Sequence, residues 1–525
     1  MNDAYLARMD EGFRALGVAE TSNPGGEGLE GLEREPVGFG NGPGRDRTSS
    51  SAKEDDEKRR ETFPSFREKE DAFFPADRWL RGPVDPAGAL VHVSDRPLTC
   101  VSAAPAGDGV AVGGTDHAVR VVGVAKDDAS AASAASAASA RSRRRAPAAA
   151  SVATLRGGHR EWVTCVTHDV TRGHVVSGGM DSCVYVWARR NRNVFKNGSH
   201  GAPPHETVPT KLEGHGGSVS DVLADDGRVA SASYDKTVRL WRLQTPKNGV
   251  KSVKSVGSST ATAVATLRGH RAPALRLAAR LESGANADVA DVRDDAFGAH
   301  AFGLDFASLA SGDRGGAVLR WDAASGSLVS SRDAHEGHCT ALRWVEGADP
   351  NATPLLASGG QDGAARFWDD RQGGRPAAHA PAHARHGRGT GAVSEIAQCA
   401  GSRRVVTAGA DGYATVLDLR ADRAETVNVS SVSETVTTVA SLSSHALGDF
   451  AYSLCVAPGA DVAFVGDGAG HVHCVDVAGA NTGGVPRVAF ALGAHRGATR
   501  ALVATRDGKL CAAGDDGRVA SYAFV

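Results

Sequence analysis

A short pattern that recurs along the chain constrains the fold more than any other feature of the sequence. Gly214-His215 is followed by an alternating apolar run, and Asp235 comes twenty residues after the His and six before Trp241. The residues on either side of Asp235 alternate with a period of two around a tight turn, which predicts two antiparallel strands. One hairpin cannot bury its faces, so the fold depends on whether the pattern returns.

The pattern returns throughout the second part of the chain. A Gly-His or Ala-His pair occurs at five histidines: His159, His215, His270, His335 and His495. A turn Asp is followed six positions later by a large residue in five units: Asp181 with Trp187, Asp235 with Trp241, Asp362 with Trp368, Asp411 with Leu417, and Asp516 with Tyr522. Three weaker units pair Asp116 with Val122, Gly315 with Trp321, and Ala469 with Val475. These copies predict eight similar units.

A Gly-His pair and a closing Trp-Asp, repeated about every 40–45 residues, are typical of four-stranded propeller blades. The chain resembles the WD-repeat β-propeller family in these recurring residues and in the stretch LLASGGQDGAARFWD at 355–369. The resemblance covers about residues 89–525. The resemblance implies an all-β propeller of eight blades. Seven blades are the alternative if the first or the seventh unit is not a blade. Residues 89–93 would supply the outer strand that the last unit lacks, and would close the ring.

The remaining segments are polar. Residues 1–80 are predicted to be a mostly disordered arm, with a short helix at 3–17 where apolar residues recur at helical spacing. Four insertions are predicted to be disordered loops of the 89–525 propeller: 126–151, 189–209, 244–262 and 282–303.

The resemblance also implies a structural role for the recurring residues. In the family, the His, a Ser or Thr, the turn Asp and the Trp form a buried hydrogen-bonded set within each blade. Carried over here, the sets are His159, Asp181 and Trp187, then His215, Asp235 and Trp241 with Ser231 or Ser233, and parts of later sets at Asp362, Trp368, Asp411 and Asp516. The first, fourth and seventh units depart from the pattern. We expect those blades to rely on apolar packing and to be less rigid.

The family mostly serves as interaction scaffolds, so the expected function is a non-enzymatic adaptor for proteins or peptides. On such folds, the exposed positions lie just before the turn Asp and just before the innermost strand. The residues at or beside these positions are Trp162, Met180, Tyr234, Arg271 and Gln361. Aromatic and Arg side chains at such places are typical of binding hot spots. The alternative for Trp162 is that it packs on the neighbouring blade.

A second hypothesis comes from Trp368-Asp369-x-Arg371. These residues resemble the box found in WD-repeat substrate receptors of cullin-4 ubiquitin ligases, which implies that Asp369 and Arg371 contact the adaptor subunit of the ligase. A third hypothesis is an RNA-associated or nuclear assembly factor. The arginines at 141 and 143–145 lie in an Ala/Ser stretch without aromatic residues, which favours a solvated tether over a nucleic-acid interface.

Charge and motifs exclude several classes. The net charge of -2 gives no electrostatic reason for binding nucleic acid or an anionic membrane. No apolar stretch approaches the roughly 20 residues of a membrane span, and the start lacks a signal-peptide core, so the expected location is cytosol or nucleus. The chain lacks the GxSxG, HExxH and Walker motifs, so no enzyme and no cofactor are expected.

Histidine and cysteine patterns give no metal prediction. His379, His383 and His386 form a loose cluster that could hold a metal ion, but the Pro, Arg and Gly residues around them favour a mobile loop. The eight cysteines form no CxxC pair and are interpreted as free thiols.

Overall fold

The computed structural model describes residues 74–105, 107, 109–123, 151–169, 171–189, 208–244, 260–281, 304–345, 354–369, 376–383, 391–399, 402–429, 432–479, 484–505 and 507–525. The predicted helix at 3–17, the arginines at 141 and 143–145, and Arg371 lie outside these residues. Most of each of the four predicted insertions also does, so the expectations for these segments stay predictions.

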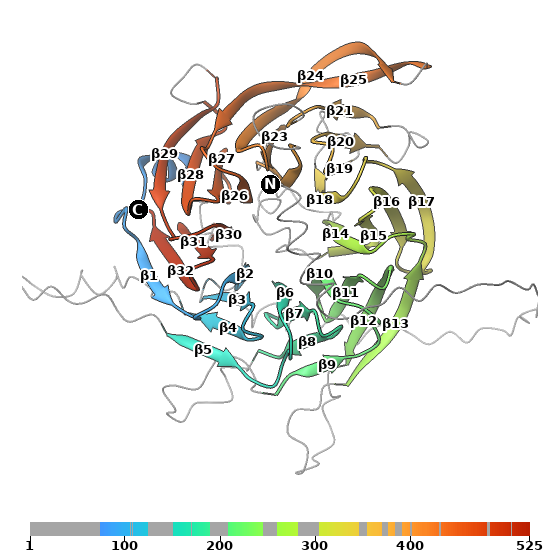
Figure 1. The fold of residues 1–525 in the computed structure, drawn as a ribbon, viewed down its shortest axis with the longest axis vertical. Coiled ribbons are helices and arrows are strands. Elements are labelled where there is room, and N and C mark those ends of the chain that lie inside the picture. Colours follow the sequence, from blue (N-terminus) through green and yellow to red (C-terminus); the bar gives the residue numbers. More distant parts are fainter. Residues whose placement is uncertain are drawn as a thin grey trace, which may run out of the picture. The chain divides into compact units, whose positions relative to one another are not determined.

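Among the described residues, eight four-stranded antiparallel blades are arranged around a ring, as the repeats predict (Figure 1). Blades I and II contain β2 (Leu98–Ala103), β3 (Val110–Gly114), β4 (Val119–Val122), β5 (Val152–Leu155), and β6 (Val163–His168), β7 (Val175–Gly179), β8 (Val184–Trp187), β9 (Thr210–Leu212). Blades III and IV contain β10 (Val219–Asp225), β11 (Arg228–Ser233), β12 (Thr237–Gln244), β13 (Thr260–Arg268), and β14 (Ala274–Leu281), β15 (Leu304–Asp313), β16 (Ala317–Asp322), β17 (Ser327–Asp333).

The second half of the ring follows the same order. Blades V and VI contain β18 (Cys339–Val345), β19 (Leu355–Gly360), β20 (Ala365–Trp368), β21 (Ala378–Ala380), and β22 (Val393–Gln398), β23 (Arg404–Gly409), β24 (Tyr413–Val429), β25 (Val432–Ala446). Blades VII and VIII contain β26 (Ala451–Val456), β27 (Val462–Asp467), β28 (His471–Asp476), β29 (Arg487–Gly493), and β30 (Thr499–Ala504), β31 (Lys509–Gly514), β32 (Arg518–Ala523) with β1 (Ala89–His92).

The ring closes as the sequence predicts. Strand β1 pairs antiparallel with β32, in a register that runs from Ala89 opposite Ser521 to His92 opposite Arg518. The outer strand of blade VIII therefore comes from the start of the propeller, and the three remaining strands come from its end. This pairing removes the free edge that an open last blade would leave.

Blades V and VI are joined at their outer edges, which the repeats did not predict. Strands β24 and β25 are much longer than the other strands of their blade, and Figure 1 shows their hairpin extending beyond the ring. The short outer strand β21 of blade V pairs in parallel with β25, with Ala378 opposite Thr437. The two blades thus form one eight-stranded sheet.

A short helix adds to the core between blades VII and VIII. Helix α3 (Ala76–Arg81) carries Trp79, whose side chain is 0% exposed. The indole lies against Phe524 and Phe464, with ring centroids 4.6 and 5.5 Å away, and Phe74 packs against its edge. Residues 74–80, which the sequence analysis placed in the N-terminal arm, therefore contribute a buried anchor to the propeller.

No helix among the described residues has the length and the apolar character that crossing a bilayer requires.

Candidate functional site

One backbone hydrogen bond recurs in every blade and fixes a ring of paired positions. The residue that follows the second strand of the blade donates its N–H to the carbonyl of the residue that precedes the innermost strand, at 2.8–3.0 Å. The pairs are Thr115 and Pro97, Met180 and Trp162, Tyr234 and Ser218, Arg314 and Pro273, Gln361 and His338, Ala410 and Ala392, Gly468 and Phe450, and Asp515 and Ala498. We call these sixteen residues the turn ring. Each blade thus presents two side chains at equivalent places on one face.

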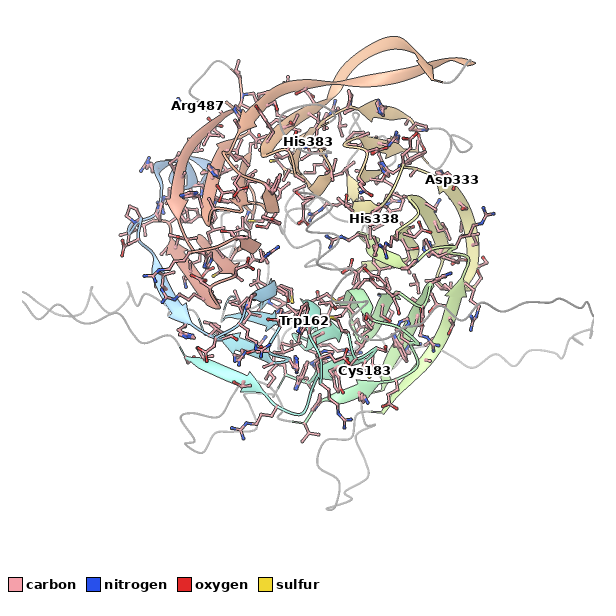
Figure 2. The ribbon with its side chains drawn as sticks, in the orientation of Figure 1. Trp162, Cys183, Asp333, His338, His383 and Arg487 are labelled. Carbon is pink, nitrogen blue, oxygen red and sulfur yellow. The ribbon has the colours of Figure 1, made fainter. Side chains whose placement is uncertain are left out.

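The turn ring is aromatic and apolar over blades II and III. Trp162 is 40% exposed, and Met180 and Tyr234 beside it are half-buried. Figure 2 shows Trp162 and His338 near the axis of the ring, whereas Asp333 and Arg487 lie at its outer edge. A large exposed indole held by a rigid strand end loses little entropy when a partner covers it, which is the property of a binding anchor.

The next two blades of the turn ring are polar. Arg314 donates from Nε to Nε2 of His338 at 3.1 Å, and the backbone N–H of His338 donates to Oε1 of Gln361 at 3.2 Å. Three exposed basic residues lie in the loops and turns of the adjoining blades II to IV: Arg160, Lys236 and Arg271. The surface over blades II to V therefore combines aromatic and cationic groups.

Four of the predicted binding residues lie at positions of the turn ring, in blades II, III and V: Trp162, Met180, Tyr234 and Gln361. Arg271 is exposed in the loop before β14. Asp369, which follows β20, is only 6% exposed, and Arg371 lies outside the described residues. The proposed contact with a cullin-4 ligase adaptor accordingly stays a prediction.

The recurring His and Asp residues lie inside the blades. Nδ1 of the His faces a turn carboxylate at 2.8–3.0 Å in five blades: His159 and Asp181, His215 and Asp235, His335 and Asp362, His383 and Asp411, and His495 and Asp516. In four of them Nε2 faces a hydroxyl at 2.7–2.9 Å: Ser177, Ser231, Ser358 and Thr407. Of the two serines considered for blade III, Ser231 makes this contact.

In two of these blades the Trp also joins the hydrogen-bonded set. Trp241 and Trp368 each donate from Nε1 to the same Ser oxygen that faces the His, at 2.8 Å. Because an indole N–H only donates, the Ser oxygen accepts from the Trp, and the hydroxyl hydrogen stays available to the His or to another acceptor. Trp187 differs, since its Nε1 points to the carbonyl of Arg156 at 3.4 Å. Imidazoles with both nitrogens engaged in a buried set stiffen a blade and are unsuited to proton transfer with a substrate.

Blade IV corrects an expectation. The sequence analysis aligned Gly315 with the turn Asp and expected apolar packing, but Asp313 takes that role and accepts from Nδ1 of His270 at 2.9 Å. Ser311 faces the other ring nitrogen at 2.6 Å, and Trp321 donates to Ser311 at 2.7 Å. The set is therefore complete.

The turn carboxylate occupies one of two positions that are two residues apart in the blade. Gly360 of blade V is equivalent to Asp313, and a Cβ at Gly360 would lie 2.3 Å from Nδ1 of His335. Gly179 and Gly409 show the same close approach to their histidines. Because strand side chains repeat with a period of two, residues two positions apart point to the same side. Blade V has glycine two residues before its Asp, and blade IV has glycine two residues after its Asp.

Blade VI contains a set that the sequence analysis missed. His383 was interpreted as part of a loose cluster with His379 and His386. It takes the place of the recurring His in this blade and faces Asp411 and Thr407. His383 and its Asp are completely shielded from solvent. His379 lies on β21, and His386 is outside the described residues. The signal was the Ala382-His383 pair, which matches Ala334-His335 but stands farther from the following strand.

Blades I and VII also have polar substitutes for the set, contrary to the expectation of apolar packing. In blade I, Asp116 accepts from the hydroxyl of Ser94 and pairs with Arg120, both at 2.6 Å. In blade VII, Oδ2 of Asp467 faces Nε2 of His473 at 2.9 Å and Nδ1 of His471 at 3.2 Å. A carboxylate thus lies at the turn between the second and third strands in every described blade.

These sets predict acid-sensitive stability. Burial alone would raise the pKa of the Asp181, Asp235 and Asp362 carboxyls, but hydrogen bonds from their histidines, together with further hydrogen bonds and nearby positive charge, outweigh it, so each pKa lies below its usual value. Burial lowers the pKa of His335 and His495 despite their facing carboxylates. Both kinds of group bind protons more readily in the unfolded chain.

The free energy of unfolding is therefore expected to fall as pH decreases. The loss should begin below about pH 6.5, where histidines of the unfolded chain titrate, and steepen below about pH 4, where its carboxylates do. Urea denaturation at pH 7.5, 6, 5 and 4 measures the effect. Constant stability over this series would contradict the burial and pairing described above.

Comparisons with known proteins agree with this architecture. The WD domain, G-beta repeat family matches residues 150–188, 206–242 and 326–369. The chain is 26% identical over 268 residues to the ribosome biogenesis protein YTM1 of Coccidioides immitis, which covers 42% of this chain and 53% of that protein. It is also 26% identical over 211 residues to the pre-mRNA-processing factor 19 homolog 2 of Arabidopsis thaliana, covering 38% and 36%.

The fold is similar to a solved structure as well. The crystal structure of Saccharomyces cerevisiae Sqt1 superposes with a TM-score of 0.60 at 12% identity, covering 84% of this chain and 99% of that one. The sequence matches span about half of the first relative and about a third of the second. These similarities support the propeller fold and the repeats. They do not identify a binding partner of this chain.

Proposed function

The chain belongs to the WD-repeat β-propeller family, and from this premise we propose that it is a non-enzymatic scaffold that holds a protein or peptide partner on the turn ring. The observation that carries the proposal is the exposed indole of Trp162 beside Met180 and Tyr234. The buried His and Asp sets support it further, because they occupy the groups that catalysis would need.

The chemistry of the surface favours one class of partner. The part of the turn ring over blades II and III would bind an apolar side chain of the partner. The exposed basic residues Arg160, Lys236 and Arg271 would bind carboxylates of the partner. We infer that the partner presents an extended segment with an apolar anchor flanked by acidic residues.

The replacement Trp162→Ala is expected to weaken binding of such a segment by about 30-fold or more, because a hot-spot anchor contributes about 2 kcal/mol. Peptides displayed on phage would be selected on the full chain, and their affinities measured by calorimetry on wild type and variant. The matched control is Leu328→Ala, which removes another exposed apolar side chain, 44% exposed, from the outer strand β17. Leu328→Ala should bind as the wild type does.

Equal affinity of the selected peptides for the wild type and Trp162→Ala would reject the turn ring as the docking surface. Selected peptides without an excess of acidic residues would reject the inferred partner chemistry while leaving the scaffold proposal standing.

The names of the relatives suggest a setting for this activity. Both are named for assembly or processing of RNA-containing machinery, so we propose an assembly role in the nucleus for this scaffold. Fluorescence microscopy of the tagged full chain tests the location. A strictly cytoplasmic signal would remove the nuclear part of the proposal and leave the docking surface unaffected.

A further inference from the structure

A cluster of two imidazoles and a carboxylate lies at one turn of blade VII. Asp467 ends β27, and His471 and His473 follow on β28. Oδ2 of Asp467 lies 3.2 Å from Nδ1 of His471 and 2.9 Å from Nε2 of His473, and the three candidate ligand atoms lie within 4.8 Å of one another. Two ligands of a tetrahedral Zn²⁺ lie about 3.4 Å apart when each bond is about 2.1 Å. The two distances from the carboxylate oxygen to the imidazole nitrogens are within about 0.5 Å of this value.

In blade VII an imidazole stands where two other blades place an arginine beside the turn carboxylate. In blades I and V the turn carboxylate pairs with an arginine from the third strand, Arg120 with Asp116 and Arg366 with Asp362, each at 2.6 Å. In blade VII, the strand position of those arginines is occupied by His473. Among the described residues, Asp467 contacts the two imidazoles and backbone N–H groups but no Lys or Arg. The carboxylate is 1% exposed, so its charge is poorly solvated.

Access and protonation also suit a metal ligand set. Side-chain exposure rises from 1% at Asp467 through 12% at His473 to 51% at His471, so the cluster opens to solvent on one side. An aspartate carboxylate is ionised at neutral pH, as a metal ligand must be.

We propose that Asp467, His471 and His473 bind a divalent transition metal of the zinc class at the turn of blade VII. The sequence analysis expected no metal here, because the His-x-His and the Asp were not seen as one group. The two imidazole nitrogens are borderline ligands that favour Zn²⁺ over Mg²⁺, and Zn²⁺ also accepts a carboxylate oxygen. Three protein ligands leave the fourth position of a tetrahedral ion open, either for water or for a donor atom of a docked partner. The ion would link β27 to β28 next to Gly468 of the turn ring.

The test is calorimetric titration of the full chain, with its affinity tag removed, by ZnCl₂ alone and by MgCl₂ alone at pH 7.5. We expect the wild type to show one Zn²⁺ site that is absent for Mg²⁺ and that raises the thermal midpoint when filled. The variant His471→Ala, which removes a half-exposed side chain, is expected to weaken this site by more than about tenfold. His473→Gln is expected to do the same and serves if His471→Ala does not fold by circular dichroism.

The matched control is His92→Ala, which breaks another surface His and Asp pair, His92 with Asp95 at 3.2 Å, where no third ligand is present among the described residues. That variant should keep the site of the wild type. The proposal is overturned if the wild type binds no Zn²⁺, or if every folded variant of His471 and His473 binds Zn²⁺ with the affinity and stoichiometry of the wild type.

Discussion

Replacing Trp79 with alanine is expected to lower the free energy of unfolding by about 3–5 kcal/mol, the cost of deleting a large buried aromatic side chain. The indole is 0% exposed and packs on Phe524 and Phe464, so its removal leaves a cavity between helix α3 and blades VII and VIII. Urea denaturation of the full chain, followed by near-ultraviolet circular dichroism, measures the loss.

Two other tryptophan changes serve as controls for this prediction. Trp162→Ala deletes the same side chain at a half-exposed place and should cost far less stability. Trp79→Phe should keep most of the stability, because the indole N–H of Trp79 has no hydrogen-bond partner among the described residues. An unchanged midpoint for Trp79→Ala would show that helix α3 does not dock as described.

Replacing Asp313 with alanine is expected to cost about 3–5 kcal/mol, because it breaks a buried pair and leaves its partners unsatisfied. Asp313 accepts from His270 and from the backbone N–H groups of Gly315 and Ala317, each at 2.9 Å. The loss should appear first in blade IV, as faster amide hydrogen exchange in β15 and β16 than in distant blades.

Asp322→Ala is the matched control, since Asp322 lies in the same blade but accepts only from an exposed turn. It should leave exchange in the rest of blade IV unchanged. If Asp313→Ala were as stable as Asp322→Ala, the buried set of blade IV would not hold the blade together, and the structural role of the repeated His and Asp residues would fail there.

The blade number and the ring closure could be predicted from the sequence because both depend on short-range patterns. Alternating strands around a tight turn, repeated eight times, leave little choice of fold, and 89–93 is the strand needed to pair with the last one. The positions of Trp162, Met180 and Tyr234 followed from the same repeat, since they are fixed relative to the strand ends.

The carboxylates of blades IV and VII were missed because the sequence analysis fixed the Asp at one linear position. Strand geometry lets a side chain two residues earlier point to the same side of the strand. Asp313 and Asp467 both use this earlier position. A search for Asp-x-Gly as well as Gly-x-Asp would have found Asp313.

His383 and Trp79 were missed for a different reason. Residues 384–392 separate His383 from β22, so the His no longer stands at the usual distance from the innermost strand of its blade. Trp79 belongs to no repeat, and its burial results from contacts with Phe464 and Phe524, far away in the sequence. Local patterns carry no information on such long-range packing.

The central claim of this account is that the protein acts by holding a partner on the turn ring. Its most direct test is quantitative proximity labelling in cells by the wild type, by the double variant Trp162→Ala/Tyr234→Ala, and by Leu328→Ala at equal expression. We predict that the double variant loses a discrete set of labelled neighbours that the wild type and Leu328→Ala share. The same neighbours at the same intensities for all three proteins would contradict the claim.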